Sequence, residues 1–341
     1  MPDPPPLAQS ILDVIGSTPL VELNGSVAPL GLRGRLLAKL ESVNPGLSKK
    51  DRAALELIRR AREDGSLVAG QTVVALTSGN MGAGLAVVCG ALGHPFVAVM
   101  SRGNSVERAR QMTALGAEVV LVDQAPDSVP GRVSGADLDR VVQRTGEVVA
   151  ERDAFEADQF VNTACVAAHE NQTGPEIWTQ SGGQVDVFVD IVGSAASFTG
   201  VARYLRRRNP SIRTYLLEPA SAAVLAGRPA TDPSHALQGA GYCRTDLPLL
   251  DRSLITDYLY VTDAEAVAAA RHLAAREGIL GGFTTGAHLA AAWKLLSERE
   301  SGATIVFLVC DSGLKYMSTD LYLGVRPQAE SAARRAEDRA R

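Results

Sequence analysis

The sequence has few cysteines, no clustered histidines and no excess of positive charge, and each absence excludes a class of protein. Its four cysteines, Cys89, Cys165, Cys243 and Cys310, are widely spaced in mostly apolar surroundings. This spacing argues against a disulfide framework and against a zinc site, so we expect reduced cysteines and a cytoplasmic location. The five histidines share no metal-ligand spacing. We therefore assign none of them to a metal or to catalysis.

Charge and length favour a two-domain enzyme over a nucleic-acid binder. The formal net charge is −4 over 341 residues, of which 46% are apolar. A chain of this length can bury two separate cores, and without a basic face we expect no nucleic-acid partner. No segment reaches the roughly 18 uncharged apolar residues of a membrane span, and residues 1–6 lack the features of a signal peptide. We therefore expect no association with a membrane.

Strand-like runs alternate with helical patterns along most of the chain. The first such unit contains apolar runs at 35–40, 72–76, 96–100 and 118–122, with helical periodicity between them, as in 50–64. A second unit extends from 185 to about 323. This alternation predicts an α/β fold with parallel sheets.

Lys50 is the most informative residue, because it stands in a Gly/Ser turn, residues 44–52, that opens a predicted helix. The positive end of a helix disfavours an ammonium group and so helps to supply the uncharged amine that a Schiff base requires. A lysine pair at a helix start is, by itself, more often a solvated surface feature. We expect that description to hold for the neighbouring Lys49.

Two further loops change the interpretation of Lys50. The run 77–82, Thr-Ser-Gly-Asn-Met-Gly, and the run 193–197, Gly-Ser-Ala-Ala-Ser, each lie between a strand-like and a helical segment. Amides and hydroxyls at a helix N-terminus suit a carboxylate or a phosphate. Either loop alone could equally be an ordinary turn between a strand and a helix.

Taken together and in order, these segments resemble the fold-type II pyridoxal-phosphate enzymes, in the branch of cysteine synthase (O-acetylserine sulfhydrylase) and cystathionine β-synthase. The resemblance continues through the motifs at 11–20, 159–162, 173–178, 238–241, 277–282 and 311–319, and so covers nearly the whole chain. It implies two open, twisted, mostly parallel sheets flanked by helices, as in the β-subunit of tryptophan synthase. It also implies a smaller domain at 45–155, a larger domain made of 11–44 and 156–325, a solvated tail at 326–341, and a homodimer.

The resemblance implies pyridoxal 5′-phosphate as the cofactor. Lys50 matches the lysine that forms the Schiff base and moves the Cα proton, and Asn80 matches the asparagine that binds the 3′ oxygen. Ser312 matches the serine at the ring nitrogen, where a neutral hydroxyl favours loss of a β-substituent over transamination. The phosphate loop corresponds to Gly193, Ser194, Ala195, Ala196 and Ser197, and the glycines beside the cofactor ring are Gly239 and Gly241. The two alanines replace glycines, which the loop tolerates only where φ is not positive.

The resemblance places the substrate carboxylate at the residues Thr77, Ser78, Gly79, Met81 and Gln159. Met81 stands where threonine is usual, and Cys310 stands where proline is usual. Together with the alanines of the phosphate loop, these departures indicate a divergent, specialised paralogue.

The implied reaction is β-replacement on an activated L-serine, with O-acetyl-L-serine favoured, through an α-aminoacrylate. The second substrate is a small nucleophile, by default sulfide. Alternatives are the same chemistry with cyanide, an amine or hydroxyurea, an ammonia-lyase acting on serine or threonine, or a non-catalytic regulatory paralogue. The sequence alone does not name the nucleophile.

Overall fold

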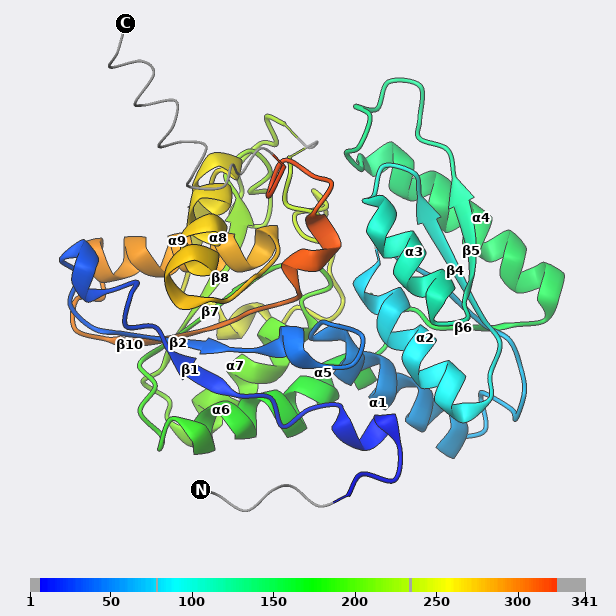
Figure 1. Cartoon of the computed structure of the whole chain (residues 1–341), viewed down its shortest axis with the longest axis horizontal. Helices are drawn as coiled ribbons and strands as arrows, with labels where there is room; N and C mark the ends of the chain where they lie inside the picture. Colours follow the sequence, from blue (N-terminus) through cyan, green and yellow to red (C-terminus); the bar gives the residue numbers. More distant parts are fainter. Residues whose placement is uncertain (1–6, 78, 233–234, 324–341) are drawn as a thin grey trace, which may run out of the picture.

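The computed structural model describes residues 7–77, 79–232 and 235–323. The strands of this part form two sheets, one of six and one of four strands, which lie side by side with helices around them (Figure 1). All strand pairs except one are parallel. The predicted α/β fold with two open, mostly parallel sheets flanked by helices is confirmed.

The larger sheet has the strand order β1-β2-β10-β7-β8-β9, and its edge strand β1 runs antiparallel to β2. Its strands are β1 (Leu20–Glu22), β2 (Arg35–Lys39), β7 (Val187–Ile191), β8 (Arg213–Pro219), β9 (Asp257–Val261) and β10 (Thr304–Leu308). The central strands β7 and β10 are buried at every residue, as is typical of parallel strands covered by helices on both faces. One of these buried residues, Asp190, is charged.

The smaller sheet has the order β5-β4-β3-β6 and is parallel throughout. Its strands are β3 (Val73–Leu76), β4 (Phe96–Ser101), β5 (Glu118–Val122) and β6 (Phe155–Glu156). Strand β4 is completely buried, whereas β5 lies at the edge of the sheet and has no fully buried residue.

Helices cover both sheets, and the order of elements along the chain is mostly strand, helix, strand. The helices are α1 (Lys50–Glu63), α2 (Asn80–Leu92), α3 (Val106–Ala114), α4 (Gly135–Arg152), α5 (Ala164–Ala168), α6 (Gly174–Gln180), α7 (Ala196–Arg208), α8 (Asp263–Glu277) and α9 (Phe283–Glu298). Helices α4 and α8 begin with capping boxes, in which Ser134 pairs with Asp137 and Thr262 with Glu265. Within the described residues, no helix is long and apolar enough to cross a membrane.

The loops that matter for function follow the carboxyl ends of β3, β7 and β10. Ligands of open α/β sheets bind beyond these ends, because the loops from neighbouring parallel strands emerge there together. Strands β7 and β10 are neighbours in the larger sheet, and β3 is central in the smaller one. Helix α1, which carries Lys50 at its first residue, packs against α2 and α5. The predicted tail, 326–341, lies outside the described residues.

Candidate active site

Lys50 begins helix α1, and the turn before it is attached to the end of strand β10. The amide of Lys49 donates to the carbonyl oxygen of Cys310 at 2.8 Å, and the amide of Ser312 donates to the carbonyl oxygen of Leu47 at 3.1 Å. These backbone hydrogen bonds hold the lysine pair beside residues 310–312, so two motifs that are far apart in the sequence meet in space.

The side chain of Lys50 is directed toward the loop that follows β7. Its Nζ donates to Ser194 Oγ at 3.3 Å. Burial and the neighbouring ammonium group of Lys49 lower the pKa of Lys50 to about 8. Near neutral pH a larger fraction of this amine is uncharged than in an ordinary lysine, and only the uncharged amine is a nucleophile.

The expectation that Lys49 is a solvated charge at the helix start is wrong. Its side chain is 11% exposed, and its Nζ lies 3.0 Å from Oδ1 of Asp190 in strand β7. Burial alone would lower the pKa of Lys49, but the carboxylate of Asp190 outweighs it and holds that pKa above its ordinary value. A lysine that stays protonated is a poor nucleophile, so the structure favours Lys50 over Lys49 for the covalent role.

The loop 193–197 forms a buried start to helix α7. Ser194, Ala195, Ala196 and Ser197 are each less than a tenth exposed. The amides in the first turn of a helix have no acceptor within that helix, and an anion is a natural partner for them. The loop therefore presents buried amide donors beside Lys50, as the predicted phosphate loop requires.

One of the two alanines in this loop does not meet the condition set by the sequence. Ala196 is the first residue of α7 and is helical. Ala195 has a φ of 66°, in the left-handed region. This conformation brings Cβ too close to the following carbonyl oxygen and costs roughly 1–2 kcal/mol.

Replacing Ala195 by glycine is therefore expected to raise the free energy of unfolding by about 1 kcal/mol, because the relief of strain exceeds the entropy that glycine adds to the unfolded chain. Urea unfolding of the cofactor-free protein measures this change. The matched control, Ala196→Gly, is expected to lower stability, because Ala196 is already helical. A loss of stability in both variants would contradict the strain assigned to Ala195.

The loop after β3 is ordered by Thr77. Its Oγ1 accepts hydrogen bonds from the amides of Gly79 and Gly82, both at 2.9 Å. Gly79 has a φ of 124°, and a Cβ there would collide with the side chain of Arg108. Ser78, also predicted to bind the substrate, lies outside the described residues.

Met81 contributes to this loop through its backbone. Its side chain is 1% exposed and packs in the apolar core around α1 and α2. Its amide lies in the first turn of α2, where it has no acceptor within the helix. A substrate carboxylate can therefore meet the amide of Met81, while the side chain acts on the loop through packing.

Asn80 and Ser312 are brought together by Asp311. Asn80 Nδ2 donates to Asp311 Oδ2 at 2.7 Å, and Asn80 Oδ1 accepts from Lys315 Nζ at 2.8 Å. Asp311 Oδ2 also accepts from the hydroxyl of Tyr316 at 2.6 Å. The sequence analysis did not single out Lys315 or Tyr316, although both lie in the motif 311–319.

The glycines at 193 and in the segment 238–241 allow two stretches of backbone to approach closely. A Cβ on Gly193 would lie 2.7 Å from the carbonyl oxygen of Gly239. The amide of Gly241 donates to the carbonyl oxygen of Val192 at 3.0 Å. Gly239 and Gly241 have φ values of 87° and 63°. The predicted phosphate loop and the predicted ring-side loop therefore lie against each other.

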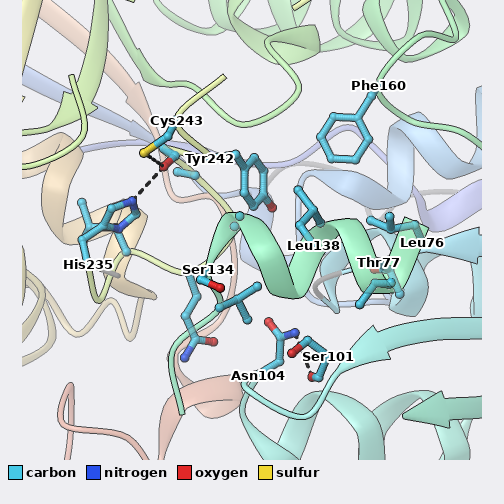
Figure 2. A pocket seen from close by; sticks show the side chains of 18 of the residues that line it. Leu76, Thr77, Ser101, Asn104, Ser134, Leu138, Phe160, His235, Tyr242 and Cys243 are labelled. Atoms are coloured by element: carbon cyan, nitrogen blue, oxygen red, sulfur yellow. Dashed lines mark hydrogen bonds between the residues drawn. The ribbon is translucent and has the colours of Figure 1, made fainter. Parts of the chain in front are cut away.

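A cavity of about 240 Å³ lies between these loops and helix α4 (Figure 2). Four of the predicted site residues line it: Thr77, Gln159, Gly239 and Gly241. The side chain of Gln159 makes no hydrogen bond to another described residue, so its amide is available to a ligand in the cavity.

The cavity also has walls that the sequence analysis missed. Phe160 and Tyr242 face each other edge to face, with ring centroids 5.9 Å apart. His235 lies opposite them in Figure 2, and its Nε2 is 2.9 Å from the carbonyl oxygen of Gly241. Its Nδ1 is buried with no hydrogen-bond partner among the described residues. In the sequence, only their proximity to the motif 238–241 could have indicated that His235 and Tyr242 belong to the site.

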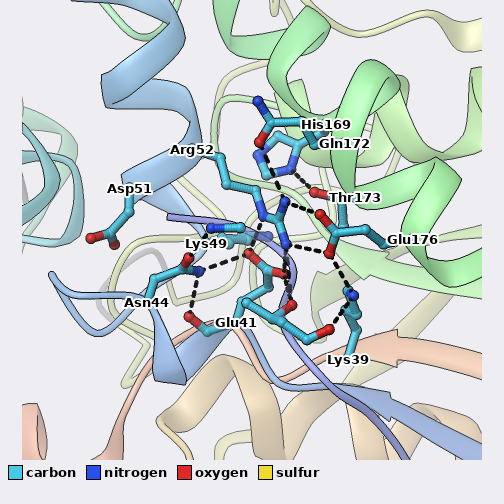
Figure 3. A network of polar contacts seen from close by, with 12 residues as sticks. Lys39, Glu41, Asn44, Lys49, Asp51, Arg52, His169, Gln172, Thr173 and Glu176 are labelled. Atoms are coloured by element: carbon cyan, nitrogen blue, oxygen red, sulfur yellow. Dashed lines mark hydrogen bonds and ion pairs between the residues drawn. The ribbon is translucent and has the colours of Figure 1, made fainter. Parts of the chain in front are cut away.

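A buried ionic network supports the segment that carries Lys50 (Figure 3). The guanidinium of Arg52 makes two hydrogen bonds to Glu41, each at 2.8 Å, and two to Glu176, at 2.6 and 2.8 Å. Burial alone would raise the pKa of Glu41, but Arg52 outweighs it and holds that pKa at about 2. The network ties the start of α1 to helix α6.

The donor set fits the cofactor that the resemblance implies. Lys50 offers an amine with a lowered pKa, the loop 193–197 offers buried amides and the hydroxyl of Ser194 to a phosphate, and Asn80 offers an amide group. Ser312 accepts the amide of Leu314 at 3.3 Å through its Oγ, which leaves its hydroxyl proton to donate. We therefore propose that these residues bind pyridoxal phosphate in the roles that the resemblance implies.

The chain is similar to known proteins over nearly its whole length. Residues 11–311 match the profile described as pyridoxal-phosphate dependent enzyme. The chain is 39% identical over 337 residues to cysteine synthase 3 of Caenorhabditis elegans, covering 98% of this chain and 96% of the relative. It is 37% identical over 329 residues to O-ureido-L-serine synthase of Streptomyces lavendulae, covering 96% of each. The crystal structure of an O-ureido-L-serine synthase mutant with O-ureido-L-serine bound has a TM-score of 0.86 at 35% identity, covering 98% of this chain and 99% of the other.

Proposed function

Since the chain belongs to the pyridoxal-phosphate dependent enzymes, we propose that it catalyses β-replacement on an activated L-serine, with O-acetyl-L-serine as the favoured substrate. This proposal rests on one observation: Lys50 lies against the buried loop 193–197, with its Nζ 3.3 Å from Ser194 Oγ. Cysteine synthases and O-ureido-L-serine synthase among the relatives support the same reaction class.

Lys50 holds the cofactor covalently and moves the proton at the substrate Cα. When bound, pyridoxal phosphate supplies the ring that stabilises negative charge at Cα. Lys50 suits the proton transfer because its pKa of about 8 lies near the working pH. Lys49 cannot replace it while Asp190 keeps its amine protonated.

The substrate carboxylate is bound where helix α2 begins. The hydroxyl of Thr77, the amide of Met81 and the side chain of Gln159 are the donors we assign to it, and we include Ser78 on the basis of the sequence motif. The amide of Gly79 donates to Thr77 Oγ1, so Gly79 contributes by shaping the loop. Donors at a helix N-terminus stabilise a carboxylate without a charged side chain.

Ser312 would lie at the ring nitrogen of the bound cofactor, where its hydroxyl would donate a hydrogen bond without transferring a proton. The neighbouring Asp311 could protonate that nitrogen if its carboxylate reached it. Asp311 Oδ2 accepts from Asn80 and Tyr316, which fixes the position of the carboxylate, while its Oδ1 is buried without a partner among the described residues. This arrangement supports loss of the β-substituent over transamination.

Sulfide is the default nucleophile, and the product would then be cysteine with release of acetate. The cavity favours a second candidate, a larger polar nucleophile such as an amine or hydroxyurea. Besides Thr77 and Gln159, its wall carries Asn104, His235 and Gln238. His235 Nδ1 and Gln238 Oε1 are buried without a partner among the described residues. Sulfide needs no such partners, whereas an organic nucleophile could pair with both atoms.

A panel of nucleophiles tests the proposal. The purified enzyme would receive O-acetyl-L-serine with sulfide, cyanide, an amine or hydroxyurea, and mass spectrometry would identify the products. We expect acetate and a β-substituted alanine with at least one of them. Pyruvate and ammonia, with no nucleophile incorporated in any reaction, would contradict β-replacement and indicate an ammonia-lyase.

We also propose that the enzyme is a cytoplasmic homodimer with domains at 45–155 and at 11–44 with 156–325. The free state of Cys89, Cys165, Cys243 and Cys310 supports the location. The family resemblance implies the dimer, and analytical ultracentrifugation measures it directly.

A further inference from the structure

A buried ion pair lies directly behind the predicted phosphate loop. Lys49 Nζ is 3.0 and 3.3 Å from the two carboxylate oxygens of Asp190, and 2.8 Å from Ser197 Oγ. Ser197 in turn donates its hydroxyl proton to Asp190. Asp190 is fully buried, and Lys49 is 9% exposed. Lys49, Asp190 and Ser197 thus form a closed triangle of hydrogen bonds inside the protein.

His288 is a second basic group beside Asp190, with its Nε2 3.2 Å from Oδ1. The same Nε2 lies 2.7 Å from the amide nitrogen of Ile191, and Nδ1 lies 2.8 Å from the carbonyl oxygen of Leu308. Burial alone would lower the pKa of His288, but Cys310 and Asp190 outweigh it and raise that pKa to about 9. Lys49 contacts both carboxylate oxygens and Ser197, so it is the counter-ion of Asp190 that reaches the phosphate loop.

A metal ion is a weaker explanation of the same cluster. Ligand atoms of Asp190, His288 and Cys310 lie within 4.8 Å of one another. The carboxylate, however, is already paired with the ammonium of Lys49, and both ring nitrogens of His288 have partners. A cation would have to displace these contacts.

The position of the pair points to the phosphate. Ser197 belongs both to the triangle and to the buried loop that faces the cofactor. A phosphate monoester carries a charge of about −1.5 to −2 near neutral pH. In a buried site, the carboxylate of Asp190 would repel it unless a positive charge lay equally close. The ammonium of Lys49 is that charge, one hydroxyl away from the loop.

We propose that Lys49 is a positioning residue for the cofactor phosphate: held by Asp190, it sets the charge of the phosphate loop and orients the hydroxyl of Ser197. Its charge acts on the phosphate end of the cofactor, whereas Lys50 acts on the aldehyde end. The assignment rests on membership of the pyridoxal-phosphate dependent family and is independent of which nucleophile the enzyme uses.

The test compares pyridoxal phosphate with pyridoxal, which lacks the phosphate. Dissociation constants of both would be measured by absorbance titration of the cofactor-free protein, and their ratio is the phosphate preference. We expect Lys49→Met to lower this preference about tenfold or more, because it removes a charged donor and leaves Asp190 without that counter-ion beside the phosphate. Asp190→Asn, which keeps the ammonium, is expected to maintain or increase the preference.

Two controls separate this effect from a loss of folding. Lys39→Met removes another buried lysine, which pairs with Glu176 at 2.7 Å away from the loop, and should leave the preference unchanged. The double variant Lys49→Met with Asp190→Asn removes both charges of the pair, and we still expect a lower preference than in the parent. A parental preference in the double variant, or equal losses for pyridoxal and pyridoxal phosphate in Lys49→Met, would overturn the proposal.

Discussion

Lys50→Ala is expected to abolish the visible absorbance of the lysine-bound cofactor and to reduce turnover by roughly 10³-fold or more, because the variant loses both the covalent link and the group that moves the Cα proton. Lys49→Ala is expected to keep the absorbance when the cofactor is saturating. Spectra and steady-state rates of the two variants measure these effects side by side. The opposite outcome, with colour lost in Lys49→Ala and kept in Lys50→Ala, would show that the covalent lysine is Lys49.

The pH dependence of cofactor attachment gives a second measurement on the same residue. An ordinary lysine has a pKa of 10.5, and that of Lys50 is about 8. Since the uncharged amine predominates above the pKa, the rate at which the cofactor-free protein attaches pyridoxal phosphate should rise with pH and reach half its maximum near pH 8. Lys49→Ala should move this midpoint upward, because it removes a neighbouring positive charge. A midpoint above pH 10 in the parent would contradict the proposed activation of Lys50.

Arg52→Ala is expected to lower the free energy of unfolding by about 3–5 kcal/mol, because it leaves the fully buried carboxylate of Glu41 without its counter-ion. The side chains of Arg52 and Glu41 are both 0% exposed, and Glu176 loses the same partner. Chemical unfolding of the cofactor-free protein, followed by circular dichroism, measures the change. Because Arg52 fixes the first turn of helix α1, where Lys50 lies, attachment of the cofactor should also slow.

Arg35→Ala is the matched control for this prediction. Arg35 also binds a glutamate through two hydrogen bonds, to Glu22, but both side chains are 40% exposed. Exposed ion pairs contribute about 0–1 kcal/mol, because water already solvates both charges. Comparable losses in Arg52→Ala and Arg35→Ala would show that burial of the Arg52 network carries no special weight.

The sequence was sufficient for features that depend on local order along the chain. The alternation of apolar runs and helical periodicity predicted helix α1 to within one residue, 50–64 against Lys50–Glu63, and strand β5 at 118–122 without error. It also placed Lys50, Asn80 and the loop 193–197 between strands and helices. In a parallel sheet such loops converge at the carboxyl ends of the strands. The order of these segments along the chain therefore already implies a common site.

Only the tertiary structure decided the contacts between residues that are far apart in the chain. Lys49 looks like a surface residue in its own segment, and only the folded chain places it on Asp190, 141 residues further along. The left-handed conformation of Ala195 follows from how β7 meets α7. The cavity walls come from two loops far apart in the sequence, one with Phe160 and one with His235 and Tyr242. Local patterns record which groups prefer water or a helix, whereas the burial and pairing of a charge depend on partners that only the folded chain brings near.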